Sequence, residues 1–429
     1  MRNWRILGSI TALALASAAW AQSASVPLPS RETRTLTAQA ALAKRVVAER
    51  KVPGIVIVTG LGDGAPRVVS EGRIAVEPDA PAATADSLWR VYSMTKPITG
   101  IAAMILVEEG KLKLDQPISE FIPAFKDMKV LVDPTKDLAS RPATRPITVR
   151  NLLTHTAGFE YVLPGRSGPL VDAYTRLGLN PAQVNALLEP GMRAARPKTL
   201  AEFADRVAAQ PLIADPGAKW SYSIGLDVLG RVIEVASGMP FDTFVNTRIF
   251  TPLKMNDSYW TVPQDKVRAF ATNYMSPGLA ADTGAASVWL QPPSFPYGGA
   301  GLVMSAHDYD RFLHMLLDGG TLDGARVLKP ETVRLAMSDL LPASVDRSTL
   351  ANMTADTGAP MGFGAGGSVY LADKPGGPGK GTYGWAGAAG SVGWVDPVHK
   401  LRGTMMINSF SEQMLKRETS QAVYADLAR

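Results

Sequence analysis

The sequence predicts an α/β fold combined with an all-α part: an antiparallel sheet flanked by helices, built from both ends of the chain, with a helical domain inserted between them. Strand-like sequence occurs near residues 55–69 and returns at residues 384–407, while helical periodicities dominate the stretch between them. With 429 residues, 46% of them hydrophobic and 19% charged, the chain can bury a large core.

The first elements follow from short-range patterns. Residues 36–51 have the spacing of an amphipathic helix, which Pro53 and Gly54 end. Residues 55–58 and 67–69 are rich in Val and Ile, which favours strands, and a Gly-Asp-Gly turn lies between them. An antiparallel hairpin is therefore expected at this end of the chain.

The next helix begins near Ile98, from which apolar residues recur at positions i, i+3, i+4 and i+7, and Gly110 suits its end. Pro97 is tolerated without loss only in the first turn of a helix. We therefore expect Ser93 and Lys96 to lie at or inside that first turn.

Later segments complete the predicted architecture. Residues 22–92 and 290–429 are expected to form the domain with the sheet, residues 93–289 a mainly helical domain, and the active site should lie at their junction. Further helices are predicted for residues 199–210, 225–237, 306–317 and 411–427.

The first 21 residues have the pattern of a secretory signal. Arg2 and Arg5 form a basic start, an apolar run rich in Ala and Leu follows, and Ala19 and Ala21 give the small-x-small cleavage pattern. The apolar run is too short for a stable membrane span. We expect an exported protein, periplasmic or secreted, whose mature chain starts near Gln22.

Composition excludes several classes of site. The chain has no cysteine, so disulfides, thiolate nucleophiles and cysteine-ligated metals are excluded. The four histidines are scattered without metal-ligand spacing, and neither a metal nor another cofactor is expected. The formal charge of +5 is modest, and no basic cluster interleaved with aromatic residues suggests nucleic acid as a partner. The oligomeric state stays open.

Ser93 and Lys96 are the candidate nucleophile and base. Residues three apart on a helix share a face, with Cβ atoms roughly 5–6 Å apart. Free N–H groups and the positive dipole end of a helix start favour a developing anion and disfavour a charged lysine, whereas Lys96 can accept a proton only when it is neutral. A lone Ser-x-x-Lys arises by chance in a chain of this length, so other motifs must support it.

Several ordered motifs together resemble the serine hydrolases of the β-lactamase and penicillin-binding fold, and among these the family VIII carboxylesterases, relatives of class C β-lactamases. The resemblance covers most of the mature chain, from about residue 35. It rests on Ser93-Met94-Thr95-Lys96, Leu114-Asp115-Gln116-Pro117, Leu152-Leu153-Thr154-His155-Thr156-Ala157-Gly158, Pro216-Gly217 to Tyr222-Ser223, and Trp385 to Gly390.

The resemblance implies roles for individual residues. Ser93 matches the nucleophile, Lys96 its base partner and Tyr222 the tyrosine of the second motif, and which of Lys96 and Tyr222 is the general base stays open. The backbone N–H groups of Ser93 and Ala388 would form the oxyanion hole. His155 is expected to be structural rather than catalytic.

Two departures from the class C pattern favour esters over β-lactams. The third motif, Lys-Thr-Gly in class C enzymes, reads Trp385-Ala386-Gly387, and Trp385 offers no charge to a β-lactam carboxylate. Ile224 replaces the asparagine of Tyr-x-Asn. Trp385 and Gly387 are candidate substrate-binding residues, as is Tyr297, for which simple packing is the alternative.

The predicted function is a serine carboxylesterase that hydrolyses short-chain, small-molecule acyl esters through an acyl-enzyme on Ser93. A β-lactamase or D-Ala-D-Ala carboxypeptidase could use the same Ser93, Lys96 and Tyr222. The alternative from another class is a non-catalytic cell-wall-binding relative, which would have no reason to keep all three side chains.

Overall fold

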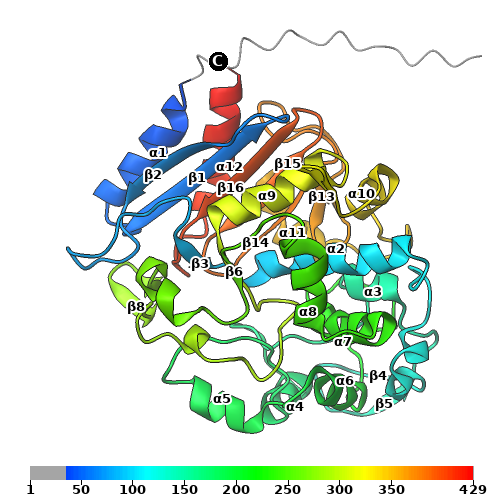
Figure 1. Ribbon diagram of the computed structural model, residues 1–429. Helices are drawn as coiled ribbons and strands as arrows, with labels where there is room; N and C mark the ends of the chain where they lie inside the picture. The colour runs from blue at the N-terminus through cyan, green and yellow to red at the C-terminus, as the bar shows by residue number, and fades with distance from the viewer. Residues whose placement is uncertain (1–34, 429) are drawn as a thin grey trace, which may run out of the picture. The chain divides into compact units, whose positions relative to one another are not determined.

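The computed structural model describes residues 35–428, and a seven-stranded antiparallel sheet is its main element (Figure 1). The strand order is β12-β13-β14-β15-β16-β1-β2. Strand β1 (Gly54–Leu61) therefore pairs with both β2 (Arg67–Gly72) and β16 (Leu401–Met406), which joins the two ends of the chain. The other strands are β12 (Met361–Phe363), β13 (Ser368–Tyr370), β14 (Tyr383–Ala386) and β15 (Val392–Asp396).

Helices cover both faces of this sheet (Figure 1). Helices α1 (Thr37–Ala48) and α12 (Leu415–Leu427) pack on one face, and α9 (Ala306–Leu317) packs on the other. Successive side chains of a strand point to opposite faces, so Ile55 and Ile57 join the core under α1 and α12, while Val56 and Val58 join the main core. Strand β1 is buried on both faces, which explains its continuous apolar sequence.

The helical part of the chain surrounds α2 (Thr95–Glu108), whose residues from Thr95 to Leu106 are all buried. Helix α7 (Gly225–Ser237) packs directly against α2. Besides short 3₁₀ helices, the other described helices are α3 (Val149–Leu153), α4 (Pro169–Arg176), α5 (Glu189–Ala195), α6 (Leu200–Ala208), α8 (Phe241–Val245), the π-helix η4 (Asn246–Phe250), α10 (Pro330–Ala336) and α11 (Ser348–Met353).

A small sheet of order β3-β9-β6 supports the chain just before α2. It consists of β3 (Leu88–Arg90), β9 (Val303–Ser305) and β6 (Ser258–Tyr259). Three two-stranded sheets complete the described strands: β4 (Lys129–Leu131) with β5 (Ser140–Pro142), β7 (Asn273–Ser276) with β8 (Leu279–Asp282), and β10 (Thr321–Leu322) with β11 (Ala325–Arg326).

These elements confirm the predicted fold class, an antiparallel sheet flanked by helices with strands from both ends of the chain. Helix α12 begins at Leu415 rather than at residue 411, because the Gln413 side chain donates to the carbonyls of Ala388 and Phe410 and holds this segment as a turn. The division into a sheet domain and a helical domain stays a prediction, because the chain from Leu36 onward forms a single compact unit. The predicted signal at residues 1–21 lies outside the described residues.

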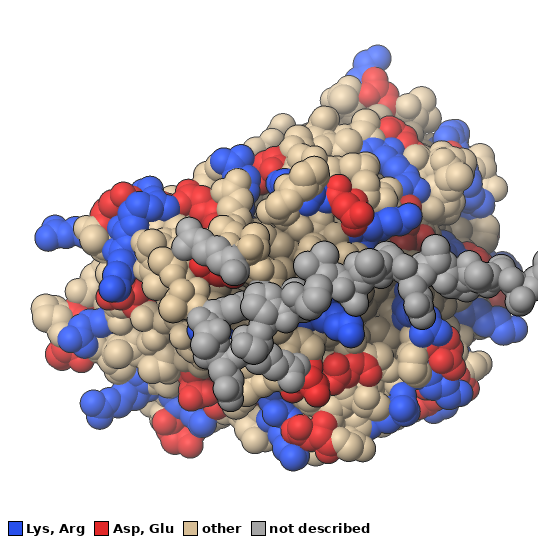
Figure 2. Space-filling view, turned by 90° about the horizontal axis from the view of Figure 1, so that it is seen from above, with Lys and Arg blue, Asp and Glu red and all other residues tan. Residues whose placement is uncertain are grey.

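Charged side chains of both signs are intermixed on the face shown in Figure 2. The visible part of that face carries no extended basic tract. Within residues 35–428, none of the helices combines the length and the apolar character that crossing a membrane would require.

Candidate active site

Ser93 lies where the small sheet passes into the buried helix α2. After β3 the chain makes one 3₁₀ turn at Tyr92–Met94, and α2 begins at Thr95 with Pro97 in its first turn. A proline is harmless there because the N–H groups of a first turn have no partner inside the helix. Ser93 and Lys96 therefore lie at the helix start, as the position of Pro97 predicts.

The Ser93 hydroxyl contacts two groups that can carry a proton. Lys96 Nζ lies 3.2 Å from Ser93 Oγ, and the Tyr222 hydroxyl lies 2.7 Å from it. Lys96 is fully buried, and its amine also donates to the carbonyl of Gly299 at 2.8 Å. The amine lies 4.6 Å from the centre of the Tyr222 ring. The three predicted catalytic side chains thus meet at one oxygen atom.

His155 supports the segment that carries Tyr222. Its ring packs against the Tyr222 ring with centroids 4.7 Å apart, and Nδ1 accepts a hydrogen bond from the Ser223 N–H at 3.2 Å. Burial is the main cause that holds the pKa of His155 well below its ordinary value, so the imidazole is neutral. The His155 ring therefore positions Tyr222, by contact with its ring and by the hydrogen bond from the neighbouring Ser223 backbone.

Trp385, on strand β14, contacts Tyr222 from the side of the sheet. The indole Nε1–H donates to the Tyr222 hydroxyl oxygen at 3.4 Å, and the two ring centroids are 5.7 Å apart. The sequence predicts substrate binding as the role of Trp385. The structure adds a direct contact between Trp385 and the Tyr222 hydroxyl, which in turn contacts Ser93 Oγ.

The backbone beyond β14 lies close to the nucleophile. A Cβ atom on Gly387 would lie 2.5 Å from the carbonyl oxygen of Val91, so only glycine allows this approach. Ala388 follows at the rim of the pocket, and Gln413 Nε2 donates to its carbonyl oxygen at 2.8 Å. This packing brings the backbone next to Ala388, whose N–H the resemblance implies is the second oxyanion donor, close to the turn that carries Ser93.

Tyr297 is fully buried and does not line the pocket, which corrects its predicted role in substrate binding. Its ring packs edge-on against Phe295 and lies 5.4 Å from the guanidinium carbon of Arg196. The packing alternative is therefore the right one. The part of this loop that reaches the site is the peptide of Gly299, whose carbonyl accepts from Lys96.

The N–H of the same residue, Gly299, contacts Asp227, a buried carboxyl that sequence reasoning missed. Asp227 Oδ1 accepts from the Gly299 N–H at 2.8 Å, and Oδ2 has no hydrogen-bond partner among the described residues. Burial raises the pKa of Asp227 to about 7, although the charge of Lys96 opposes this. The backbone of one residue, Gly299, thus connects Asp227 to Lys96. An acidic residue within the apolar sequence of α7 was the available signal.

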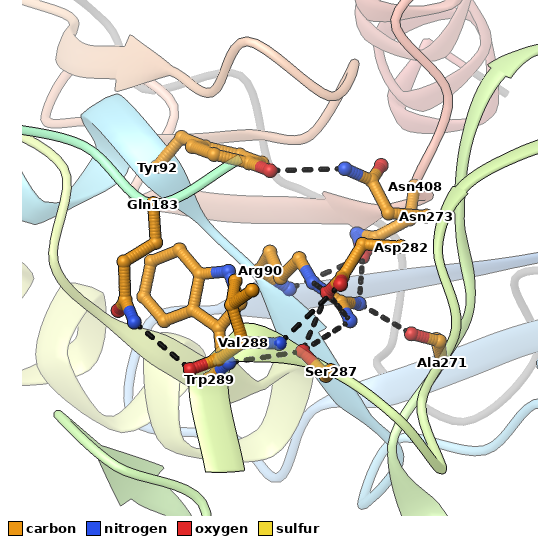
Figure 3. Close-up of polar contacts among 10 residues, drawn as sticks. All are labelled: Arg90, Tyr92, Gln183, Ala271, Asn273, Asp282, Ser287, Val288, Trp289 and Asn408. Atoms are coloured by element: carbon orange, nitrogen blue, oxygen red, sulfur yellow. Dashed lines mark hydrogen bonds and ion pairs between the residues drawn. The ribbon is translucent and has the colours of Figure 1, made fainter. Parts of the chain in front are cut away.

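Tyr92, next to the nucleophile, has a strained backbone that its side chain helps to hold. Its φ is +43°, in the left-handed region that bulky residues rarely adopt. The ring packs edge-on against Trp289, and the phenol accepts a hydrogen bond from Asn273 Nδ2 at 2.9 Å (Figure 3). Such strain persists only where the surroundings fix the residue. These contacts therefore help to set the direction of Ser93.

A buried ion pair anchors the strand before Tyr92 (Figure 3). Arg90 and Asp282 are both fully buried and lie 2.5 Å apart. The Arg90 side chain also donates to the carbonyl of Ala271 and to the Ser287 hydroxyl. The backbone N–H of Arg90 donates to Asn408 Oδ1. A buried charge with this many partners fixes the strand that leads to Ser93.

A pocket of about 810 Å³ opens beside Ser93. Ser93, Tyr222, Trp385, Gly387 and Ala388 all line it. Its other walls near the nucleophile are mostly apolar and include Tyr161, Val162, Leu163, Met275 and Phe410. Among residues 35–428, no three His, Asp or Glu side chains gather as metal ligands would.

A serine hydroxyl in contact with an amine and a phenol, at the foot of a pocket, is the arrangement of a serine hydrolase. The β-lactamase family profile matches residues 40–426, and the chain belongs to that family.

Two esterases are among the named relatives, beside several acyltransferases. Esterase EstB of Burkholderia gladioli is 32% identical over 366 residues, which cover 79% of this chain and 83% of EstB. Lovastatin esterase of Penicillium rubens is 30% identical over 76% of this chain and 80% of its own. A Mycobacterium tuberculosis protein whose name states no activity is 36% identical over 73% of this chain and 75% of its own.

Solved structures share the fold. EstCE1, described as a hydrolase with promiscuous acyltransferase activity, superposes with a TM-score of 0.71 at 24% identity and covers 92% of this chain and 98% of its own. A mutant of simvastatin synthase from Aspergillus terreus superposes with a TM-score of 0.73 at 24% identity, covering 92% of this chain and 99% of its own.

Proposed function

We propose that this protein is an exported serine carboxylesterase that hydrolyses short-chain acyl esters through an acyl-enzyme on Ser93. One observation carries the proposal: Ser93 Oγ contacts both Lys96 Nζ and the Tyr222 hydroxyl within a pocket. The names of EstB and lovastatin esterase support an ester as the substrate. The signal-like pattern at residues 1–21 supports export.

The acylation step follows from the contacts of Ser93. As Oγ attacks the ester carbonyl, its proton passes to Lys96 or Tyr222, and the same pair delivers a proton to the departing alkoxide. The C–O bond to the alcohol breaks, the alcohol leaves, and the acyl group stays on Ser93. The N–H groups of Ser93 and Ala388 would stabilise the oxyanion, and each such donor is worth roughly 3–4 kcal/mol.

Deacylation repeats the step with water. The Lys96 and Tyr222 pair takes a proton from a water molecule that attacks the acyl-enzyme, and Ser93 leaves with that proton. The products are the free acid and a restored serine. Gly299 holds the Lys96 amine in place through both steps, because its carbonyl accepts from Nζ at 2.8 Å.

The surroundings of Tyr222 favour a neutral acyl compound over a β-lactam. Trp385 presents an indole N–H to the Tyr222 oxygen and brings no cation to bind a carboxylate beside the reacting carbonyl. Ile224 is fully buried at the start of α7 and does not line the pocket, so it offers no polar contact to a substrate.

A hydrolysis panel tests the proposal. Wild-type protein should turn over p-nitrophenyl acetate and butyrate far better than a chromogenic cephalosporin, and Ser93→Ala should lose at least about a thousandfold in kcat/KM. A serine-directed phosphonate should label wild type and Ser368→Ala, a serine in the same pocket, but not Ser93→Ala. Efficient turnover of the cephalosporin without the esters would contradict the proposal.

Export is tested separately. The protein produced in a bacterial host with its full N-terminus should appear outside the cytoplasm, and N-terminal sequencing should start near Gln22. Recovery of only full-length protein from the cytoplasm would contradict export without affecting the esterase assignment.

A further inference from the structure

Two side chains of α2 donate hydrogen bonds to neighbouring carbonyls in the loop of residues 297–302. Lys96 Nζ donates to the Gly299 carbonyl at 2.8 Å, and Thr99 Oγ1 donates to the Gly298 carbonyl at 2.7 Å. Lys96 and Thr99 are three residues apart, so they share a face of the helix, and both are fully buried. The helix face that carries the candidate base is therefore bonded to two successive carbonyls of this loop.

The peptide group between Gly298 and Gly299 is also held from α7. Its carbonyl belongs to Gly298 and accepts from Thr99, while its N–H belongs to Gly299 and donates to Asp227 Oδ1 at 2.8 Å. Asp227 lies in the first turn of α7 and is fully buried. Two buried side chains, from two different helices, thus bind the two polar ends of one peptide group.

The two glycines allow this close approach but cannot fix the direction of the loop. A Cβ atom on Gly298 would lie 2.4 Å from the carbonyl oxygen of Leu226, and one on Gly299 would lie 2.6 Å from Asp227 Oδ2. Only glycine therefore fits against α7 at these positions. Glycine also has the widest choice of backbone angles. The direction of the Gly299 carbonyl consequently depends on what holds the peptide before it.

The direction of the Gly299 carbonyl matters because it places the amine that faces the nucleophile. This carbonyl accepts from Lys96 Nζ, which lies 3.2 Å from Ser93 Oγ. A lysine side chain has a flexible stem, so its amine needs acceptors to stay in one position. Proton transfer requires the two atoms within hydrogen-bond reach, and a misplacement of about 1 Å can cost about a hundredfold in rate.

We propose that Thr99 and Asp227 are positioning residues, which hold the Lys96 amine beside Ser93 through the backbone of Gly299. Neither Thr99 nor Asp227 lines the pocket, so neither contacts a substrate. Both roles rest on the proposed esterase function, in which Lys96 exchanges a proton with Ser93. The two side chains act on the same peptide from opposite ends, so the loss of either one should have the same kind of effect.

Paired substitutions test these roles. Thr99→Val removes the hydroxyl and keeps the branched shape, whereas Thr99→Ser keeps the hydroxyl. Asp227→Ala removes the acceptor, whereas Asp227→Asn keeps one. The assay is run at about pH 6, because burial raises the pKa of Asp227 to about 7 and its carboxyl is then mostly protonated and neutral, like asparagine.

Thr99→Val and Asp227→Ala should each lower kcat for p-nitrophenyl butyrate by about tenfold to a hundredfold, with KM within about twofold of wild type. Thr99→Ser and Asp227→Asn should keep kcat within about threefold of wild type, since each restores the lost hydrogen bond. Thr99→Val tests the proposal alone if Asp227→Ala does not fold.

The rate of labelling by a serine-directed phosphonate gives a second readout. Formation of the bond between Ser93 Oγ and phosphorus needs the same base but no deacylation, so this rate should fall in parallel with kcat. Val232→Ala is the control, because Val232 is fully buried in α7 and does not line the pocket. It should lower the melting temperature and leave kcat within about twofold of wild type, which separates lost position from lost stability.

A wild-type kcat in either Thr99→Val or Asp227→Ala would overturn the proposal. Equal losses within a pair, in Thr99→Ser as in Thr99→Val or in Asp227→Asn as in Asp227→Ala, would also overturn it. In all these cases turnover of the ester by the wild-type protein would leave the esterase function standing. No turnover by the wild-type protein would instead overturn the esterase function, and the two positioning roles with it.

Discussion

At the scale of single residues, two groups contact the Ser93 oxygen, and two further parts of the chain hold those groups. Lys96 comes from α2, Tyr222 from the segment before α7, and the Gly299 carbonyl holds the lysine. Trp385 joins from the sheet through the Tyr222 oxygen. No single element defines the site, so each side chain can be altered while the fold around the others is kept.

Trp385→Phe should lower kcat by about threefold to tenfold, which is the effect expected from the loss of one hydrogen bond. KM for a small ester should change little. The indole N–H stabilises the Tyr222 oxygen while that oxygen exchanges its proton, and phenylalanine keeps the ring without the donor. Steady-state kinetics with p-nitrophenyl butyrate measures the change.

Trp220→Phe is the matched control for Trp385→Phe. Trp220 also stacks on Tyr222, but its indole nitrogen has no hydrogen-bond partner in the described structure. Its replacement should leave kcat within about twofold of wild type. Equal losses in both variants would mean that ring packing, rather than the donor, matters to Tyr222.

Asp227→Asn should change how stability depends on pH. The pKa of Asp227 is about 7 in the folded protein and about 4 in an unfolded chain. Between these values the folded state holds a proton that the unfolded state has released, so wild-type stability falls as pH rises through this window, by up to about 1.4 kcal/mol per pH unit. Asparagine keeps an acceptor for the Gly299 N–H and does not titrate.

The melting temperature of Asp227→Asn relative to wild type should therefore rise between about pH 4 and about pH 7 and then level off. Thermal unfolding followed by circular dichroism across this range gives the measurement. Asp79→Asn, at an exposed position, should stay parallel to wild type. A constant difference for Asp227→Asn would show that this carboxyl does not titrate in the folded protein within that window.

At the scale of elements, the close approach between the end of β14 and the turn that carries Ser93 decides the geometry of the oxyanion site. Gly387→Ala places a methyl group 2.5 Å from the Val91 carbonyl, so one backbone segment must move. The N–H of Ala388 would move with it. We expect kcat to fall by about a hundredfold or more, which is the effect of removing one oxyanion-hole donor. The variant should still unfold in one cooperative transition.

Gly191→Ala is the control for Gly387→Ala. Gly191 lies in α5, and an added Cβ there meets no atom within 4 Å. Its replacement should leave kcat unchanged and stabilise the helix by up to about 1 kcal/mol. If Gly387→Ala keeps wild-type kcat, the peptide of Ala388 is not the second oxyanion donor.

The elements that sequence reasoning placed correctly are those with local signals. Helix α7 ends at a left-handed Gly238, and α9 begins after Ser305, whose hydroxyl accepts from the Asp308 N–H. Both helices have the predicted bounds. The start of α12 was placed too early because the contact that delays it, from Gln413 to Ala388, is long-range and leaves no pattern in the neighbouring residues.

The difference between local sequence signals and long-range contacts also explains which residues of the site could be predicted. Ser93, Lys96 and Tyr222 could be predicted because they are side chains in ordered motifs, and the structure brings them together. The Gly299 carbonyl could not, since the direction of a peptide group is set by the fold rather than by the residue type. Tyr297 was assigned to the pocket from its place beside this peptide, although its own ring points into the core.

At the scale of the whole molecule, the sheet joins the two ends of the chain and a buried ion pair fastens it to α9. Arg402, on β16, is fully buried and donates to Asp310 Oδ1 at 2.8 Å and to the carbonyls of Gly62 and Gly64 at 2.7 and 2.8 Å. It therefore connects the last strand, a helix and the turn of the first hairpin.

Asp310→Ala should lower the free energy of unfolding by about 3–5 kcal/mol, because it leaves the Arg402 charge buried without its partner. The double variant Asp310→Leu with Arg402→Met should cost less than the sum of the two single changes, since it removes both charges together. Urea unfolding measures all of these variants. Lys51→Ala, which removes an exposed ion pair with Glu49, should cost no more than about 1 kcal/mol. Additive losses in the double variant would show that the two charges do not stabilise each other, and that Arg402 stabilises the fold through its contacts with the hairpin turn instead.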